Sequence, residues 1–187
     1  MMDMVNWSAH GKAFCNQISR RIHLSKLLHE CLPTFHQLNK YGGLHRPCPA
    51  CASPNETRDH ILRCLAGPTT SRVALQLLGC NRQDSCRVQN SPLLIYALRS
   101  ALEDWFQSAR DNEVRPILHP TDVRQLVTQQ NAIGWRQLFN GRFSVKWAKL
   151  QHAYHYKHRT EAGNQRRDGT QWQVKLIVFM WDQWRLL

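Results

Sequence analysis

Residues 48–64 read CPACASPNETRDHILRC, and this stretch decides how the chain around it can fold. Cys48 and Cys51 are separated by two residues, a spacing at which a tight turn presents both sulfurs to one point. His60 and Cys64 are four positions apart, so on a helix they face the same side. Zinc is bound by four such ligands in a tetrahedron. The sequence therefore predicts a zinc site formed by Cys48, Cys51, His60 and Cys64.

The composition of this cluster indicates a structural role for the metal. Three thiolates and one neutral imidazole fill all four positions around a tetrahedral zinc ion, so no position is left for a catalytic water. Ile61 and Leu62 lie between two ligands and are expected to pack into the small core that the metal organises. The alternative interpretation is a chance pairing of core cysteines with a surface histidine. The paired spacing favours zinc over that alternative.

The remaining cysteines are predicted not to bind metal. Their spacing is looser, and an unbridged cysteine usually behaves as a small apolar side chain. The total of seven cysteines is odd and no export signal is present, which argues against a disulfide framework. We therefore expect core positions at Cys15, Cys31, Cys80 and Cys86.

Helical patterns flank the cluster on both sides. Before it, the segment from about Ala9 to Leu38 is predicted to be helical, with apolar residues recurring at intervals of three and four until Pro33 interrupts. After it, Ser91-Pro92 marks a helix start, because serine caps a helix and proline is tolerated at its first position. The apolar face that follows consists of Leu94, Ala97, Leu98, Ala101, Trp105 and Ala109.

Three more helices are predicted towards the end of the chain. Pro120-Thr121-Asp122 begins the first, whose region closes at Asn140-Gly141. Ser144 caps the second. Thr170 with Gln173 resembles a capping box at the start of the third. This last helix is apolar nearly all round, so we expect it to be buried.

The predicted fold is mainly α, with a small CCHC zinc knuckle between a leading helix and a helical C-terminal half. The expected segments are residues 1–40, 41–68 and 69–187 for these three parts. The apolar pattern of the last helix reaches Leu187 without a capping signal. This pattern favours either a chain that is cut short or one whose missing continuation completes the packing.

The cluster and its surroundings resemble a known family. Residues 48–64 are similar to the zinc-binding region that follows the polymerase domain in retroelement reverse transcriptases. Residues 27–34 look like the helix leading into that region, and residues 130–135 with Trp147 look like the tail of such proteins, so the resemblance covers about residues 7–187. It implies a retrotransposon origin and nucleic-acid binding that assists a polymerase. It also implies the ligand set Cys48, Cys51, His60 and Cys64.

The chain departs from this family where catalysis is concerned. It contains no Tyr-x-Asp-Asp motif and no Asp-x-Lys or Glu-x-Lys tripeptide, which a polymerase and a metal-dependent nuclease of this kind would need. We therefore expect a module that is not an enzyme and has no small-molecule substrate.

The charge balance favours a polyanionic partner, RNA or DNA. Lys and Arg number 25 against 13 acidic residues, giving a formal net charge of +12. Residues 142–167 concentrate this charge and interleave it with aromatic residues, among which an exposed Tyr156 could stack on a base. The predicted nucleic-acid contacts are Arg142, Lys146, Lys149, Arg159, Arg166 and Arg167.

Two alternatives stay open for this segment. The first, an ordinary amphipathic helix with a solvated basic face, is favoured over nucleic-acid contact for this segment, because Trp147 and Tyr154 look like core residues. The chain would then be a zinc-stabilised protein-interaction or scaffolding module, with a polymerase domain or another protein as its partner.

The sequence predicts neither export nor membrane insertion. Residues 1–12 lack the apolar core of a secretory signal. The longest apolar stretch, residues 174–184, is shorter than the ~20 residues that span a bilayer. We expect an intracellular protein without a membrane partner, and the choice between nucleus and cytoplasm stays open.

Overall fold

The structure, a computed structural model, is helical in the parts of the chain that it describes. These are residues 2–29, 47–54, 56–64, 91–107, 120–158 and 169–183, together with residues 31, 34, 36, 38 and 42. The predicted mainly α fold is confirmed there, with a Cys/His cluster between helices. The elements are η1 (Met2–Met4), α1 (Trp7–Cys15), η2 (Ile18–Arg20), α2 (Arg21–Leu28), α4 (Arg58–Arg63), α6 (Pro92–Gln107), α7 (Thr121–Ile133), η3 (Trp135–Asn140), α8 (Val145–Lys157) and α9 (Gly169–Gln183).

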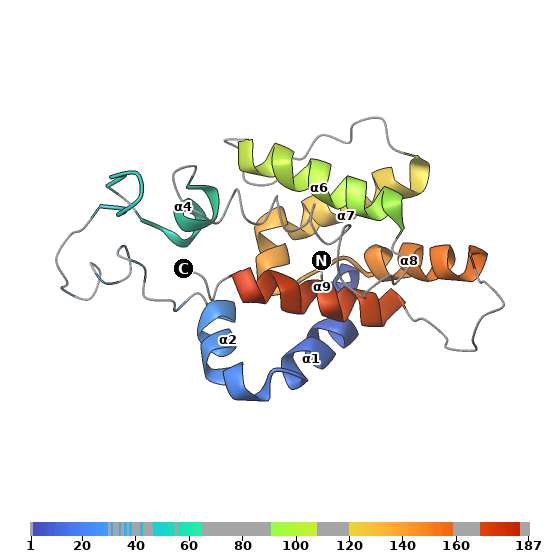
Figure 1. Cartoon of the computed structure of the whole chain (residues 1–187), viewed down its shortest axis with the longest axis horizontal. Helices are drawn as coiled ribbons and strands as arrows, with labels where there is room; N and C mark the ends of the chain where they lie inside the picture. The colour runs from blue at the N-terminus through green and yellow to red at the C-terminus, as the bar shows by residue number, and fades with distance from the viewer. Residues whose placement is uncertain are drawn as a thin grey trace, which may run out of the picture.

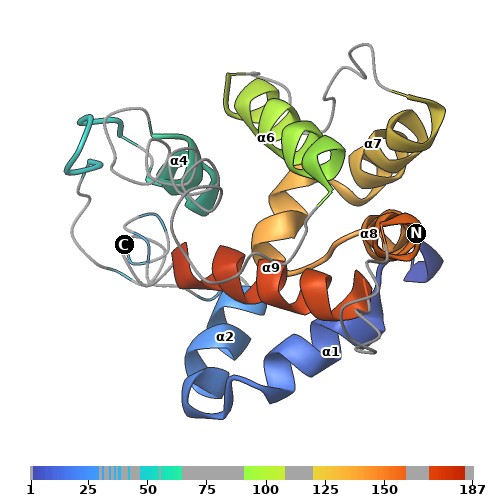
Figure 2. The same ribbon diagram turned by 45° about the vertical axis from the view of Figure 1, so that its right-hand side comes forward.

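Helix α9 is the centre of the molecule. It packs against α1 on one side and against α8 and η3 on another, and α6 and α7 lie beyond α8 and η3 (Figures 1 and 2). One core cluster joins side chains from α1, α2 and α4 to those of the later helices. The three segments expected from the sequence thus share a core. None of the helices described here is long and apolar enough to cross a membrane.

Local sequence signals set the starts of α6 and α8. The Ser91 hydroxyl accepts a hydrogen bond from the backbone N–H of Leu94 at the beginning of α6 (3.5 Å). The Ser144 hydroxyl accepts one from the backbone N–H of Lys146 at the beginning of α8 (3.1 Å). Both helix starts are therefore confirmed. The predicted apolar face of α6 is also buried as far as the structure describes it, at Leu94, Ala97, Leu98, Ala101 and Trp105.

The leading segment, predicted to be helical from about Ala9 to Leu38, is not one continuous helix where the structure describes it. Within the described part of that segment, the helical path breaks at Asn16 and Gln17, and Gln17 has a non-helical backbone. The break changes the chain direction, so that α1 buries Ala9 and Ala13 beside α9 while α2 directs Leu24 into the core. An ion pair between Arg20 of η2 and Asp182 of α9 holds the bend.

Two of the cysteine predictions are wrong. Cys15 and Cys31 are exposed and do not belong to the core. Cys15 is the last residue of α1 and lies two positions after the buried Ala13, so it points away from the face that packs on α9. Cys31 follows the end of α2. Cys80 and Cys86 lie outside the described residues.

The start of α9 is decided by close packing, and the predicted capping box is wrong. The helix begins at Gly169, so Thr170 lies inside it. A Cβ at Gly169 would stand 1.9 Å from the backbone oxygen of Ala148 and 2.8 Å from the backbone nitrogen of His152. Only glycine therefore permits α9 to approach α8 at this point. Gln173, the other member of the predicted box, is buried and bonds to other parts of the chain.

A buried amide organises the junction between α7 and α8. Gln130 is fully buried, and its Nε2 donates to the backbone oxygens of Gly134 (3.4 Å) and Arg142 (3.3 Å). Its Oε1 accepts from the backbone N–H of Ser144 (3.0 Å) and from the indole N–H of Trp147 (3.1 Å). Two carbonyls on one end and two N–H groups on the other allow the amide only one orientation.

The hydrogen bonds at this junction extend to α9 and to the start of α1. The backbone oxygen of Ser144 accepts from Nε2 of Gln173 (3.2 Å), and Oε1 of Gln173 accepts from Nδ2 of Asn6 (2.8 Å). Asn6 then caps α1 by accepting from the backbone N–H of Ala9 (3.1 Å), and its own N–H bonds to the oxygen of Phe143 (2.9 Å). The caps of α1 and α8 are therefore parts of one network.

We predict that Gln130→Leu destabilises the fold by about 2–4 kcal/mol, because a similar volume is kept while two buried N–H donors lose their acceptor. Urea unfolding followed by tryptophan fluorescence measures the change. The matched control is Gln125→Leu on the same helix, where the side chain is exposed, and its effect should stay within about 0.5 kcal/mol. Equal stabilities for the two variants would contradict the role assigned to Gln130.

Candidate metal centre and basic face

The first two cysteines of the cluster are held by a tight turn. The backbone N–H of Ala52 donates to the oxygen of Cys48, and the N–H of Cys48 donates to the oxygen of Ser53, both at 2.8 Å. Ala52 has a φ of 59°, a value that a residue with a Cβ rarely adopts. The backbone thus folds back on itself between residues 48 and 53. This brings the side chains of Cys48 and Cys51 to one side of the turn.

The other two members are carried by α4. Its N-cap is Thr57, whose hydroxyl accepts from the backbone N–H of His60 (3.1 Å). The helix ends at Cys64, where the backbone becomes extended. His60 and Cys64 therefore stand one turn apart and face the same side, as the sequence predicted.

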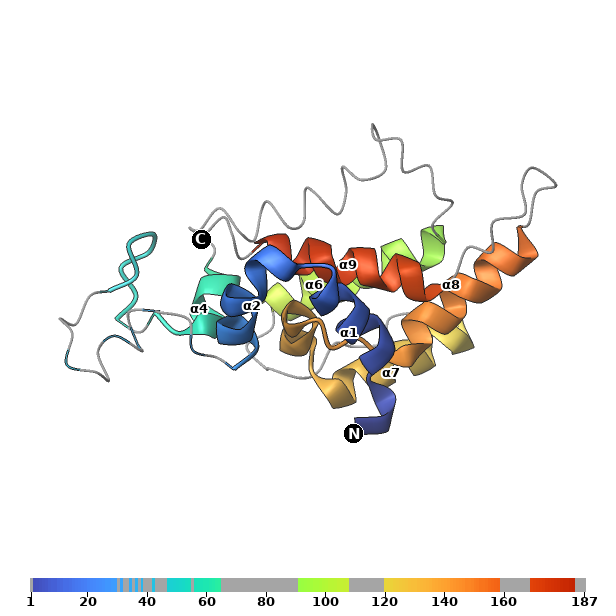
Figure 3. The ribbon, with the colours of Figure 1, turned by 90° about the horizontal axis from the view of Figure 1, so that it is seen from below.

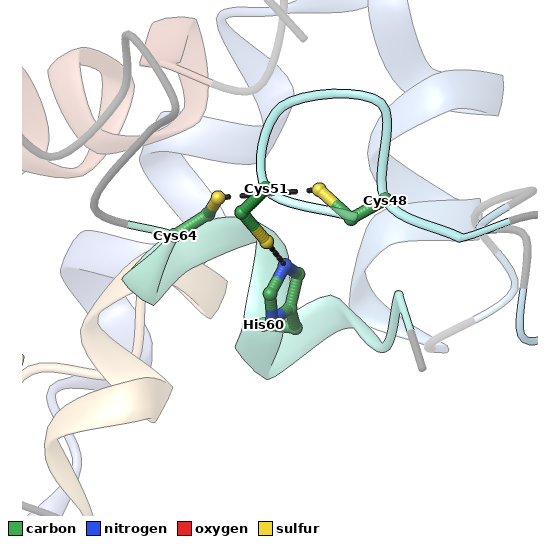
Figure 4. A group of neighbouring side chains, drawn as sticks. All are labelled: Cys48, Cys51, His60 and Cys64. Carbon is green, nitrogen blue, oxygen red and sulfur yellow. Dashed lines mark hydrogen bonds between the residues drawn. The ribbon is translucent and has the colours of Figure 1, made fainter. Parts of the chain in front are cut away.

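The structure brings the four predicted ligand residues together. One ligand atom from each of Cys48, Cys51, His60 and Cys64 lies within 4.8 Å of the others. The Sγ atoms of Cys48 and Cys64 are 3.9 Å apart, and Sγ of Cys51 is 3.2 Å from Nε2 of His60. Figure 4 shows the four side chains pointing towards one another from the turn and from α4. Such a group can hold a metal ion.

The electrostatic environment of the cluster favours thiolate formation at Cys51. A hydrogen bond with the backbone of Ser53 is the largest cause that lowers the pKa of Cys51, and the thiols of Cys64 and Cys48 add to it. Cys51 is exposed, whereas Cys48 and Cys64 are buried. A metal needs the deprotonated sulfur, so this turn is suited to a cation.

Other residues of α4 pack against the helical body. Leu62 is only 1% exposed and belongs to the common core, and Ile61 packs against that core. The guanidinium carbon of Arg63 lies 4.4 Å from the centroid of a Trp105 ring, a cation–π contact with α6. Figure 1 shows α4 beside the C-terminal end of α6. This contact was not predicted, because nothing in the sequence spacing relates residue 63 to residue 105.

The predicted nucleic-acid contacts have different environments. Arg142 is half-buried and donates to Oε1 of Gln137 (3.0 Å), and Lys146 bonds to the side chain of Gln125. Lys149 is exposed on α8. The structure therefore leaves Lys149 as the most accessible of the three. Arg159, Arg166 and Arg167 lie outside the described residues.

The remaining polar side chains of α8 also differ in exposure. His155 is half-buried and bonds to Gln151 (3.0 Å). Lys157, which was not singled out as a contact, is exposed near the end of the helix together with Tyr156. Positions 149, 153 and 156 recur at the helical period, so they lie on one side of α8. The sequence spacing alone could have predicted this shared face.

Comparisons of the chain with protein-family models, curated proteins and solved structures find no match. The resemblance to retroelement reverse transcriptase-like proteins therefore rests on the sequence motif alone.

We predict that Leu62→Ala lowers the free energy of unfolding by about 2–5 kcal/mol, because it opens a cavity in the core that α4 shares with α6. Urea unfolding measures the total loss, and hydrogen exchange should be faster in both α4 and α6. Leu93→Ala is the matched control, since Leu93 is 40% exposed on α6. If both variants had the same small effect, the cluster would not be coupled to the helical body.

Proposed function

We propose that the chain binds one zinc ion through Cys48, Cys51, His60 and Cys64. The supporting observation is the arrangement of the donor atoms. With Zn–S bonds of ~2.3 Å, the corners of a tetrahedron stand roughly 3.8 Å apart. The Cys48 and Cys64 sulfurs are 3.9 Å apart. Three sulfurs and one imidazole nitrogen are a donor set that favours zinc over the hard cations magnesium and calcium.

The proposed role of the ion is structural. The protein supplies all four ligands, so the zinc has no open position for a substrate or a catalytic water. A helix as short as α4 is not stable alone in water, because few residues follow its costly first turn. Metal binding can supply on the order of 10 kcal/mol to such a segment. The zinc would therefore hold α4 in the position from which Leu62 and Arg63 contact α6.

We further propose that this zinc-stabilised module contacts RNA or DNA through the exposed face of α8. The supporting observations are the exposed Lys149 and Lys157 and the absence of any acidic residue in α8. A net charge of +12 adds a long-range attraction for polyanions. On this proposal the chain is a non-catalytic module of retroelement origin. It acts beside a polymerase domain.

A second candidate function is protein interaction without nucleic-acid binding. It is favoured by Ile18 of η2 and Ile22 of α2, which are 71% and 78% exposed and lie four positions apart in the sequence. Aliphatic side chains gain more from burial against another protein than from contact with phosphates. The salt titration below separates the two candidates.

For the metal, we expect about one zinc per chain in protein purified without added metal. Elemental analysis measures it. Cys64→Ser, or Cys48→Ser with Cys51→Ser, should remove most of the zinc because a ligand is lost. The control Cys15→Ser with Cys31→Ser changes two exposed cysteines outside the cluster, and should keep it. Full zinc occupancy in the Cys48→Ser, Cys51→Ser protein would rule out this site.

For nucleic acid, we expect affinity that falls with salt, with each phosphate contact adding about 0.7–0.9 to the slope of log affinity against log salt. Fluorescence anisotropy with a labelled oligonucleotide at several salt concentrations measures it. Lys149→Glu with Lys157→Glu should weaken binding and flatten the slope at unchanged zinc content. Lys12→Glu with Lys26→Glu makes the same charge change on α1 and α2, and should have the smaller effect. If the parent protein did not bind the oligonucleotide at low salt, the nucleic-acid function would fail and protein interaction would remain as the candidate function.

A further inference from the structure

One face of α8 carries cations and an aromatic ring in a row. Lys146, Lys149, Ala153 and Tyr156 follow one another at intervals of three, four and three residues, so they lie along one side of the helix. Lys149, Ala153 and Tyr156 are exposed. The small Ala153 leaves the surface between Lys149 and Tyr156 open. We call these four residues the α8 stripe.

Tyr156 differs from the other aromatic residues of α8. Trp147 is fully buried, and Tyr154 is half-buried with its ring centroid 4.5 Å from that of His158. Tyr156 is 75% exposed, and among the described residues it has no hydrogen-bond or ring partner. A large aromatic side chain left in water has much to gain from stacking on a planar partner.

The end of α8 that carries Tyr156 projects from the body. The first residue of α9, Gly169, lies against the backbone of Ala148 and His152. The turns of α8 after His152 therefore extend past the beginning of α9, as Figure 3 shows. Residues 156, 157 and 158 are exposed in succession, on different sides of the helix. Tyr156 therefore stands on a part of α8 that the described residues of α9 do not cover.

We propose that the α8 stripe binds single-stranded nucleic acid, with an unpaired base stacked on Tyr156 and the neighbouring phosphates on Lys149 and Lys157. Lys149 and Tyr156 are seven positions apart, or ~10 Å along the helix. In a duplex, both faces of a base are covered by the stacked neighbouring bases. In a single strand, a base can turn out and stack on the Tyr156 ring. The lysines attract both forms, and the ring selects the unpaired one.

Charge complementarity favours nucleic acid over protein as the occupant. The stripe has Lys146 and Lys149 at one end, Lys157 lies next to Tyr156 at its other end, and α8 contains no acidic residue. A protein partner would have to supply a line of carboxylates together with a flat surface for the ring. A nucleic acid carries both groups at a regular spacing, and base–aromatic stacking tolerates any sequence.

This inference rests on the proposed nucleic-acid function, and the experiment keeps the two apart. Anisotropy is measured for the zinc-loaded chain with a labelled single strand and with the duplex of the same sequence, each at two salt concentrations. Tyr156→Ala should lose on the order of tenfold in affinity for the single strand and little for the duplex, with the salt slopes unchanged. Tyr156→Phe should bind like the parent, since stacking does not need the hydroxyl. Lys149→Gln should weaken both ligands and flatten both slopes.

The matched control is Tyr96→Ala, because Tyr96 is 60% exposed on α6, outside the stripe, and it should bind like the parent. Three outcomes would overturn the inference: Tyr156→Ala binds the single strand like the parent, Tyr156→Ala loses equal affinity for both ligands, or Tyr96→Ala loses as much affinity for the single strand as Tyr156→Ala does. In all three the proposed nucleic-acid function still stands, because the parent binds. If the parent binds neither ligand at low salt, the proposed function itself fails and this inference fails with it.

Discussion

The side-chain amide of Gln130 is the contact through which the C-terminal helices keep their positions. It is fully buried, and its partners are two carbonyl oxygens and two N–H groups that belong to the connection between α7 and α8. A buried polar group is costly when it is unpaired, so each partner is stable only where the amide can reach it. The backbone oxygen of Ser144 also accepts a hydrogen bond from Gln173 on α9, and Gln173 in turn accepts one from Asn6 at the start of α1. One polar network inside an apolar core thereby places α1 and α9.

The Cys/His cluster acts at another place in the fold. Helix α4 has the ligands His60 and Cys64 on one side and the core residue Leu62 on the other, with Arg63 over Trp105. A metal bound to one side of this short helix would stabilise the packing of its other side. The α8 stripe is made by a different helix, far from residues 48–64 in the sequence. Metal binding and contact with a nucleic acid can therefore be changed separately by substitution, which makes the proposed function open to direct experiment.

The predictions that came true depend on short stretches of chain. Ser91 and Ser144 cap helices because a serine hydroxyl needs an N–H only two or three residues away. The buried face of α6 follows from its helical period. The predictions that proved wrong needed a distant neighbour. Cys15 is exposed because α9 covers the other face of α1, and Gln173 bonds to Ser144 and Asn6 where a local cap was expected.

The sequence by itself determined the set of residues that can bind a metal and the places where α6 and α8 begin. The ligands come as two pairs, each spaced by three or four residues, and each helix start depends on atoms within about one turn. Only the tertiary structure decided which face of each helix is covered. It placed Gly169 against α8, set Arg63 on Trp105, and left Tyr156 exposed while Trp147 was buried on the same helix. The physical reason is that a side chain is buried only where an element from a distant part of the sequence packs against its helix. An aromatic residue at a helical spacing has the same local propensity whether its ring ends in the core or in water.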